Sequence, residues 1–224
     1  VNYLVTTKAS SAIYGKPNAG AGVLFKLNGN EYAQLSYIPS PHVSESEKFG
    51  QAVSLSDYWL AVGAVQKVYV FQRSGDSFSF LQQISSPTGC NSLACDYALS
   101  VKLFGGLMAV SKPFESVNGT PKVGVTYVYS VSAGTWVLTE TLRLSSPQEN
   151  EQFSYGLAFG WDVIAVGAPQ LDSGKGTVYL ELFARTPVPT PTATRIATPT
   201  PLLLTSPFPS RTAIVTPATL SPSP

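Results

Sequence analysis

The stretch from Phe49 to Pro87 constrains the fold of this chain more than any other part of the sequence. It predicts four short β-strands separated by turns, and imperfect copies of it fill residues 1–186. Apolar and polar residues alternate around Val53, as in a half-buried strand. The run Trp59–Gly63 is nearly all apolar, as expected for a strand buried on both faces. One four-stranded unit cannot bury both faces by itself, so the copies are expected to stack.

The copies span residues 1–41, 42–87, 96–147 and 151–186, and they are predicted to hold three, four, four and three strands. The first copy has no strand that matches Phe49–Leu55, so the sequence is expected to begin inside a repeat. It also begins with Val1 rather than Met, which we interpret as a processed or incomplete chain. In the last copy, Pro187 stands where the fourth strand would begin.

Two of the copies carry a recognisable pattern of residues. The pattern comprises Phe49-Gly50, Leu60–Ala64 and Val68–Phe71, and it recurs as Phe153, Val163–Pro169 and Gly176–Tyr179. It resembles the FG-GAP repeat, which builds the blades of the β-propeller in integrin α-chains and in many secreted surface proteins. The resemblance covers residues 1–186 and implies an all-β fold, a partial or small β-propeller of about four blades.

The third copy departs from the family pattern, since Ala98 replaces the second residue of the Phe-Gly pair and Ser111-Lys112-Pro113 replaces Gly-Ala-Pro. Many family members bind calcium through an acidic loop between the second and third strands of a blade. The matching loops here hold only Asp172 and Glu115 as acids. Because a calcium site needs several carboxylates in a short loop, we expect no metal site.

Two incomplete sheets would leave two open edges, and an open apolar edge recruits another chain. Three alternatives remain at this stage. The first sheet could pair with the C-terminal strands of the same chain, or the chain could be a fragment of a longer propeller. A strand from a neighbouring subunit could instead fill the gap, which would produce a head-to-tail polymer of copies of this chain.

Residues 187–224 differ abruptly from the repeats, with ten prolines, no glycine, no acid, and only Arg195 and Arg211 as charged residues. This composition predicts an extended polyproline-II-like tail. The same composition is typical of a disordered linker and of a mucin-like stalk. It also resembles that of the hydroxyproline-rich surface glycoproteins. We expect an apolar island of the tail to dock on a propeller edge, and we favour Arg211, Thr212, Ala213, Ile214 and Val215. The candidate positions for O-glycosylation or proline hydroxylation are Thr186, Pro187, Thr190, Pro191, Thr198, Pro199, Thr200, Pro201, Ser206, Pro207, Thr216, Pro217, Ser221, Pro222, Ser223 and Pro224.

The two cysteines, Cys90 and Cys95, lie between the second and third copies. The short spacing allows a disulfide-closed loop, which would favour an oxidising compartment, and two free thiols are the alternative. Too few other ligands accompany them for a zinc site. Asn118-Gly119-Thr120 is a sequon for N-glycosylation in the longest expected loop.

Charge and motif content exclude several classes of function. The net charge is +1 with no basic run, so the electrostatic footprint of a nucleic-acid binder is missing. No apolar run has the length of a membrane span. The one histidine, His42, lies in an expected connection, and Glu45 and Glu47 are expected in a solvated turn. No nucleophile, base and acid occur together in a known catalytic pattern, so we expect neither an enzyme nor a cofactor.

Together these features predict a structural subunit of an extracellular glycoprotein fibre, appendage or surface layer, assembled through propeller edges and the proline-rich tail. The alternative is an adhesion or carbohydrate-binding propeller module on a glycosylated stalk. That alternative requires clustered exposed aromatic residues on one face, with Tyr58, Trp59 and Trp161 as candidates.

Overall fold

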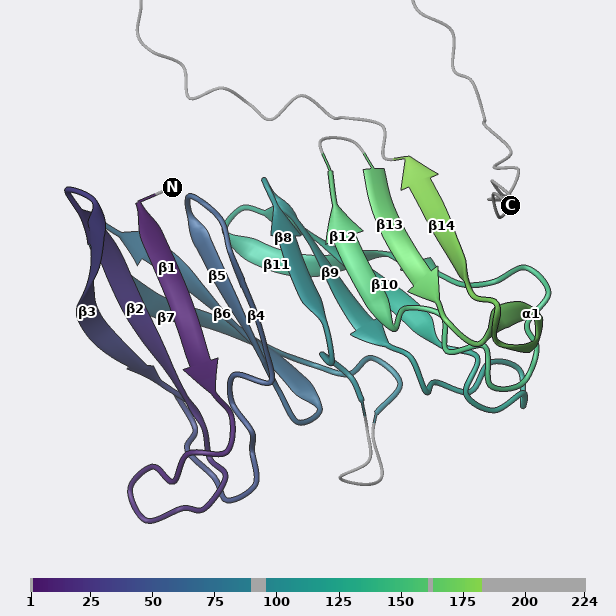
Figure 1. The fold of residues 1–224 in the computed structure, drawn as a ribbon, viewed down its shortest axis with the longest axis horizontal. Helices are drawn as coiled ribbons and strands as arrows, with labels where there is room; N and C mark the ends of the chain where they lie inside the picture. Colours follow the sequence, from purple (N-terminus) through teal and green to yellow (C-terminus); the bar gives the residue numbers. More distant parts are fainter. Residues whose placement is uncertain (1, 90–95, 161–162, 183–224) are drawn as a thin grey trace, which may run out of the picture.

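The fold is all-β in the part of the chain that the computed structural model describes, residues 2–89, 96–160 and 163–182 (Figure 1). Within these residues the strands form four antiparallel sheets of three, four, four and three strands. The all-β prediction and the number of strands in each repeat are therefore confirmed. The only helix in the described ranges is a single turn, α1 (Leu171–Gly174).

Each sheet is an antiparallel meander built from consecutive strands. Sheet 1 holds β1 (Tyr3–Lys8), β2 (Ala21–Asn28) and β3 (Glu31–Pro39). Sheet 2 holds β4 (Ala52–Leu55), β5 (Trp59–Ala64), β6 (Lys67–Ser74) and β7 (Ser77–Ser85). Sheet 3 holds β8 (Val101–Phe104), β9 (Leu107–Lys112), β10 (Val125–Ser132) and β11 (Thr135–Leu142). Sheet 4 holds β12 (Gly156–Phe159), β13 (Val163–Ala168) and β14 (Thr177–Leu182).

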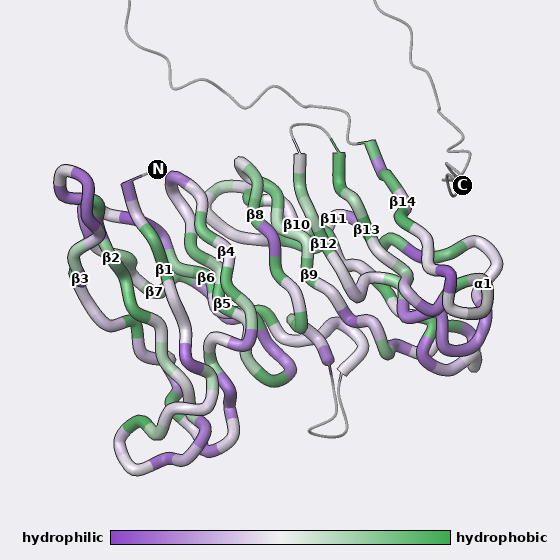
Figure 2. The backbone as a smooth tube through the Cα atoms, in the orientation of Figure 1, coloured by the Kyte–Doolittle hydropathy of each residue, from purple (hydrophilic) through white to green (hydrophobic). Residues whose placement is uncertain are grey.

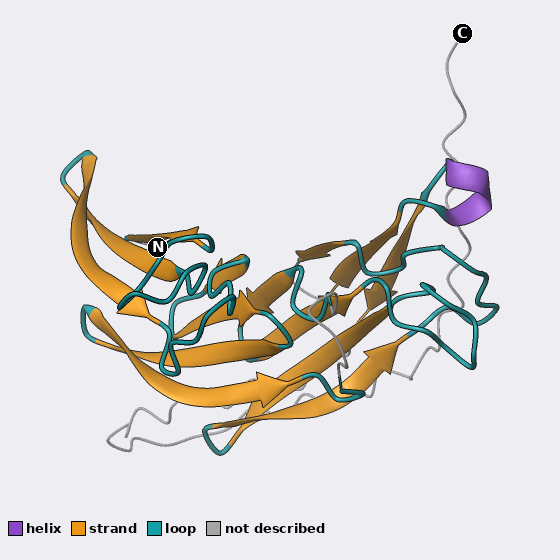
Figure 3. Ribbon diagram, turned by 90° about the horizontal axis from the view of Figure 1, so that it is seen from below, coloured by secondary structure: helices purple, strands orange, loops and turns teal. Residues whose placement is uncertain are grey.

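The four sheets stand face against face in chain order, and the row curves when it is seen from below (Figures 1 and 3). We call the side of a sheet that faces the preceding sheet its front face, and the side that faces the following sheet its back face. In sheet 1, the front face is the side away from sheet 2, and in sheet 4 the back face is the side away from sheet 3. Hydrophobic residues follow the strands and hydrophilic residues gather in the loops (Figure 2). This arrangement arises because every inner sheet is apolar on both faces and has to be covered on both.

Three apolar clusters fill the spaces between neighbouring sheets. Leu24 and Ile38 of sheet 1 meet Leu60, Tyr69 and Phe71 of sheet 2. The back face of sheet 2 meets the front face of sheet 3 in the largest cluster, whose core is formed by Ala61, Val68, Val70, Met108, Val110, Tyr127, Tyr129 and Trp136. Ala109 of sheet 3 meets a third cluster on sheet 4, which contains Phe153, Leu157, Ile164 and Val166.

Polar side chains also join sheet 2 to sheet 3. Gln82 on β7 donates from its amide nitrogen to the carbonyl of Trp136 at 3.0 Å, and its amide oxygen accepts from the Trp136 N–H at 2.8 Å. Near the opposite edge, the hydroxyl of Ser54 accepts from the N–H of Leu103 at 2.9 Å. Because each contact satisfies a backbone group on the next sheet, these bonds fix the relative position of the two sheets.

A second, longer repeat relates sheets 1 and 2 to sheets 3 and 4. The N–H of Phe49 donates to the carbonyl of Ala19 at 2.9 Å, and 104 residues further on the N–H of Phe153 donates to the carbonyl of Val123 at 2.7 Å. The bridges Ile13↔Lys16 and Val117↔Thr120 have the same spacing. The chain is therefore two copies of a two-sheet unit, and the sheet 2–sheet 3 contact joins one unit to the next.

In each unit, a long loop contacts the following sheet through a glycine. The loop joins β1 to β2 in the first unit and β9 to β10 in the second. A Cβ on Gly20 would lie 2.1 Å from the carbonyl oxygen of Phe49, and one on Gly124 would lie 2.0 Å from that of Phe153. Both glycines have positive φ, +83° and +92°, a backbone conformation that residues with a Cβ rarely adopt. Only glycine fits these two positions, where the loop backbone touches the next sheet.

Candidate assembly surfaces at the ends of the row

The back face of sheet 4 is apolar and exposed. Val178 and Leu180 on β14 are equivalent to Val68 and Val70 on β6. The cross-strand partners show this, because Val178 pairs with Gly167 as Val68 pairs with Gly63, and Leu180 pairs with Ala165 as Val70 pairs with Ala61. Val68 and Val70 are fully buried under sheet 3, whereas Val178 is 64% and Leu180 is 49% exposed. Leu182 extends the same face. No described sheet covers these side chains.

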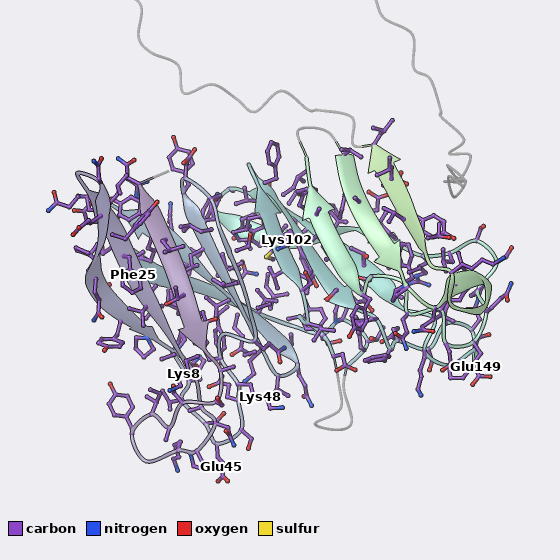
Figure 4. The ribbon with its side chains drawn as sticks, viewed as in Figure 1. Lys8, Phe25, Glu45, Lys48, Lys102 and Glu149 are labelled. Carbon is purple, nitrogen blue, oxygen red and sulfur yellow. The ribbon has the colours of Figure 1, made fainter. Side chains whose placement is uncertain are left out.

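The front face of sheet 1 is its counterpart at the other end of the row. Leu4 on β1 occupies the position of Met108 on β9, and Tyr32 on β3 that of Trp136 on β11. Met108 and Trp136 are buried against sheet 2, while Leu4 is 44% and Tyr32 is 47% exposed. Tyr37 lies on this face too and is exposed, and the labelled Phe25 lies on the neighbouring β2 (Figure 4).

Within the described residues, each end sheet is one strand short. β1 pairs there only with β2, although it is equivalent to β5 and β9, which are the second strands of their sheets. β14 pairs there only with β13, whereas the equivalent β6 and β10 pair also with the outer strands β7 and β11. Free strand edges present unpaired N–H and C=O groups that can pair with another segment.

A cavity of about 550 Å³ lies beside the free edge of β14, between sheets 3 and 4. Its apolar lining includes Leu142, Leu144 and Leu171, and its polar lining includes Tyr179, Arg143, Glu140, Glu151 and Glu181. Burial, together with the charge of Glu181, raises the pKa of the Glu140 carboxyl. Burial and the charge of Glu151 likewise raise the pKa of the Tyr179 hydroxyl. The cavity lining therefore holds three glutamates and one basic side chain, Arg143.

Glu151 has an equivalent in sheet 2 that is fully satisfied. Glu47 is buried, accepts from the Tyr69 hydroxyl, lies 3.5 Å from the Lys67 ammonium, and accepts from the N–H of Ser44 at 3.3 Å. Burial and the hydrogen bond to Glu47 raise the pKa of Tyr69. Glu151 is buried as well, but the only hydrogen bond recorded for it among the described residues comes from the N–H of Gln148 at 2.8 Å.

The burial of Glu47 corrects one expectation from the sequence. Glu45 is exposed, as a solvated turn requires, but Glu47 is only 3% exposed because its side chain turns inward beneath Tyr69. The sequence holds one signal for this burial, because the glutamate recurs. Glu47-Lys48-Phe49 and Glu151-Gln152-Phe153 both place a glutamate two residues before the equivalent phenylalanine of a unit. His42 is exposed and contacts the rings of Tyr69 and Phe80.

The remaining residues singled out in the sequence do not come together in one place. Asn118 is exposed at the tip of its loop, with φ at +52°. Tyr58 is exposed, but Trp59 is half-buried and packs edge-on against Trp136 with ring centroids 5.5 Å apart. Cys90, Cys95, Trp161 and all the tail candidates from Thr186 to Pro224, including Arg211–Val215, lie outside the described residues.

Of the two acids in the loops that match the family's calcium loops, Glu115 is described, and the side chain of Asp172 lies outside the described part of the structure. Glu115 forms an ion pair with Lys112, and Lys112 also donates to the Thr88 hydroxyl at 2.7 Å and to the carbonyl of Gly89 at 3.0 Å. The described residues contain no cluster of three or more potential metal ligands.

Comparison with known proteins adds no assignment, since no family model and no curated protein matches this chain. None of the helices in the described residues is long and apolar enough to cross a membrane.

Proposed function

We propose that this chain is the structural subunit of an extracellular fibre, appendage or surface layer, in which copies stack head to tail. The back face of sheet 4 in one copy would cover the front face of sheet 1 in the next. The four sheets would then be blades of an FG-GAP-like β-propeller arc that continues from copy to copy. Residues 187–224 would carry glycans on their Ser-Pro and Thr-Pro pairs, and Asn118 stands exposed for modification.

One observation carries the proposal: the chain already contains the contact that the copies would make. Sheet 2 and sheet 3 join one two-sheet unit to the next, and they do so through the same two faces that no described sheet covers at the ends of the row. Val68 and Val70 are covered by sheet 3, and their counterparts Val178 and Leu180 are not. Covering a large aliphatic side chain contributes on the order of 1–3 kcal/mol, so several such residues together favour association.

The contact is heterologous, because the two faces that meet are different. A heterologous contact repeats without closing unless its rotation forms a ring. The proposal therefore predicts open polymers or rings, and it does not predict a two-fold dimer.

Two variants with one blocked face each provide the test. Leu180→Asp blocks the back face and Leu4→Asp blocks the front face, while Tyr58→Asp changes an exposed residue away from both. We expect wild type and Tyr58→Asp to form higher oligomers in light scattering at micromolar concentrations, and each blocked variant to remain monomeric. Mixed together, the two blocked variants should form a heterodimer and nothing larger, because one intact face of each remains. A monomeric wild-type chain, or a mixture that stays monomeric, would refute the proposal.

A further inference from the structure

No strand among the described residues pairs with the outer edge of β14, and the side-chain space for a fourth strand is already formed there. In sheet 2, Phe80 on the outer strand packs against Tyr69 and Phe71, with ring centroids 6.1 Å and 6.0 Å apart. The ladder positions of Tyr69 and Phe71 are held in sheet 4 by Tyr179 and Glu181, and both line the cavity beside β14. An added strand would place its front-face side chains in this cavity.

The chemistry of the vacant position calls for a basic side chain. Glu140 on β11 takes the place of Gln82 on β7, whose amide holds the outer strand of the next sheet through Trp136. Glu140 and Glu181 repel each other across the cavity. Buried Glu151 lines it as well, and Thr177 holds the ladder position of Lys67, the lysine that lies beside Glu47. Arg143 is the one basic residue in the lining, against three glutamates. A strand with one cation near Glu181 and small or apolar residues elsewhere would relieve the repulsion and fill the space against Leu142 and Leu144.

We propose that residues 210–216 of the same chain bind along β14 as the fourth strand of sheet 4, with Arg211 opposite Glu181. The outer strands of sheets 1 and 2 both finish in Ile-x-Ser-Pro, at Ile38–Pro41 and Ile84–Pro87, and Ile214-Val215-Thr216-Pro217 follows the same pattern with threonine for serine. Ile84 lies opposite Val68 in the ladder. Ile214 set opposite the equivalent Val178 brings Arg211 opposite Glu181 and Ala213 opposite Tyr179 in a regular antiparallel ladder.

Other parts of the tail fit the position less well. Prolines at 187, 189 and 191 remove the N–H groups of the segment that directly follows β14. The Pro-free run 202–206 has no basic residue, and the run 192–198 in the same register would bring Ala193, with no charge, opposite Glu181. Only the run 210–216 brings an arginine to that glutamate.

The same chain can supply the strand without strain. Between Leu182 and Arg211 the chain has 28 residues, which span on the order of 90 Å as polyproline II. The tether gives the segment an effective concentration on the order of millimolar, so even weak strand pairing would be populated. The added strand would also bring Ile214 beside Val178 and Leu180 on the back face. The proposal does not require assembly of copies.

Hydrogen exchange of the full chain, followed by mass spectrometry at concentrations below those of assembly, tests the inference. We expect peptides covering β14 to exchange at least about tenfold faster in Arg211→Glu and in Ile214→Pro than in wild type. Glu181→Arg should have the same effect, and Glu181→Arg combined with Arg211→Glu should restore slow exchange. The matched control is Arg195→Glu, which should leave β14 unchanged. Exchange of β9 and β10 should stay the same in all variants and so separate strand release from unfolding.

Three outcomes would overturn the inference. Exchange of β14 that is insensitive to Arg211→Glu and Ile214→Pro would show that this segment does not bind there. Acceleration by Arg195→Glu instead would assign the position to the run 192–198. Protection of β14 that rises with protein concentration would mean that a second copy supplies the strand.

Discussion

Sheets 2 and 4 occupy equivalent places in the two units, yet sheet 2 is covered on both faces and has its fourth strand, whereas sheet 4 has, within the described residues, an exposed back face and no fourth strand. In sheet 2, Val70 is fully buried, the outer strand β7 is present, and Glu47 has both a hydroxyl and an ammonium beside it. In sheet 4, Leu180 is half-exposed, the outer strand is missing from the described residues, and Glu151 faces a cavity. The backbone geometry is shared, and the surroundings differ.

This difference shows what the repeat does and does not determine. The apolar positions determine a sheet that must be covered on both faces, and they do so identically in both units. They do not determine what covers it. In sheet 2 the chain continues into sheet 3, whereas sheet 4 keeps the same apolar pattern with no described neighbour. Exposed apolar faces of this kind are typical of interaction sites, and this is the basis of the assembly proposed above.

The largest expected effect compares the same ladder position in the two sheets. Val70→Asp would bury a carboxylate between sheets 2 and 3 without a partner, so we expect the free energy of unfolding to fall by about 4 kcal/mol or more. Leu180→Asp should lower it by less than about 1 kcal/mol in the monomer, because the position is half-exposed. Urea denaturation followed by tryptophan fluorescence measures both. Equal losses would mean that the back face of sheet 4 is covered even in an isolated chain.

The next effect compares the two loop glycines, which the longer repeat makes equivalent. Gly20→Ala and Gly124→Ala should each lower the free energy of unfolding by about 3 kcal/mol, since the new Cβ would collide with a backbone carbonyl at positive φ. Gly119→Ala is the control, with φ at +84° but nothing within 4 Å, and it should cost about 1 kcal/mol. Thermal melts of the three variants check the order. If Gly20→Ala lowered the free energy of unfolding much less than Gly124→Ala does, the two units would not be equivalent at this loop.

Alkaline pH should act chiefly through the sheet 2–sheet 3 contact. Burial raises the pKa of Tyr129 to about 12, and burial together with the neighbouring Tyr129 also raises the pKa of Tyr97. The hydroxyls of Tyr97 and Tyr129 are 2.9 Å apart within the cluster. A raised pKa means that the folded state holds its proton longer. The stability is therefore complete below about pH 10 and falls by roughly 1.4 kcal/mol per pH unit for each tyrosine as the pH rises toward 12.

Urea denaturation at pH 9, 10, 11 and 12 measures this slope. Tyr129→Phe should make the fall with pH shallower by the contribution of one tyrosine, and Tyr58→Phe, at an exposed position, should leave it unchanged. A slope that Tyr129→Phe does not alter would place the alkaline transition somewhere other than this contact.

Much of the fold can be predicted from the sequence because it rests on local patterns. The alternation around Val53 and the apolar run Trp59–Gly63 predict β4 and β5, and the turn Gly75-Asp76 joins β6 to β7 as expected. The order and number of strands in each sheet follow from the same patterns. The β-propeller resemblance remains an expectation, because the described sheets form an open row.

The end surfaces could be predicted only in part. Missing strands at both ends indicate open edges, and no other described strand pairs with the outer edges of β1 and β14. The cavity could not be foreseen, because it depends on Glu140 and Glu181 meeting across the space between two consecutive sheets. The burial of Glu47 depends on Tyr69 and Lys67 of β6, and its one signal in the sequence is the recurrence of a glutamate at position 151. Contacts between sheets carry no short-range signal.

The smallest expected effect compares the two buried glutamates. Glu47→Gln removes the charge that holds the Lys67 ammonium and weakens the hydrogen bond from Tyr69, so we expect a loss of about 2 kcal/mol in the free energy of unfolding. Glu151→Gln keeps an acceptor for the N–H of Gln148 and removes one of three charges that face a single cavity, so it should cost less than about 1 kcal/mol or even stabilise the chain. Parallel urea titrations at neutral pH compare the two variants. If Glu151→Gln proves as costly as Glu47→Gln, a cation already sits beside Glu151, and the cavity of sheet 4 is not the open counterpart of the closed site in sheet 2.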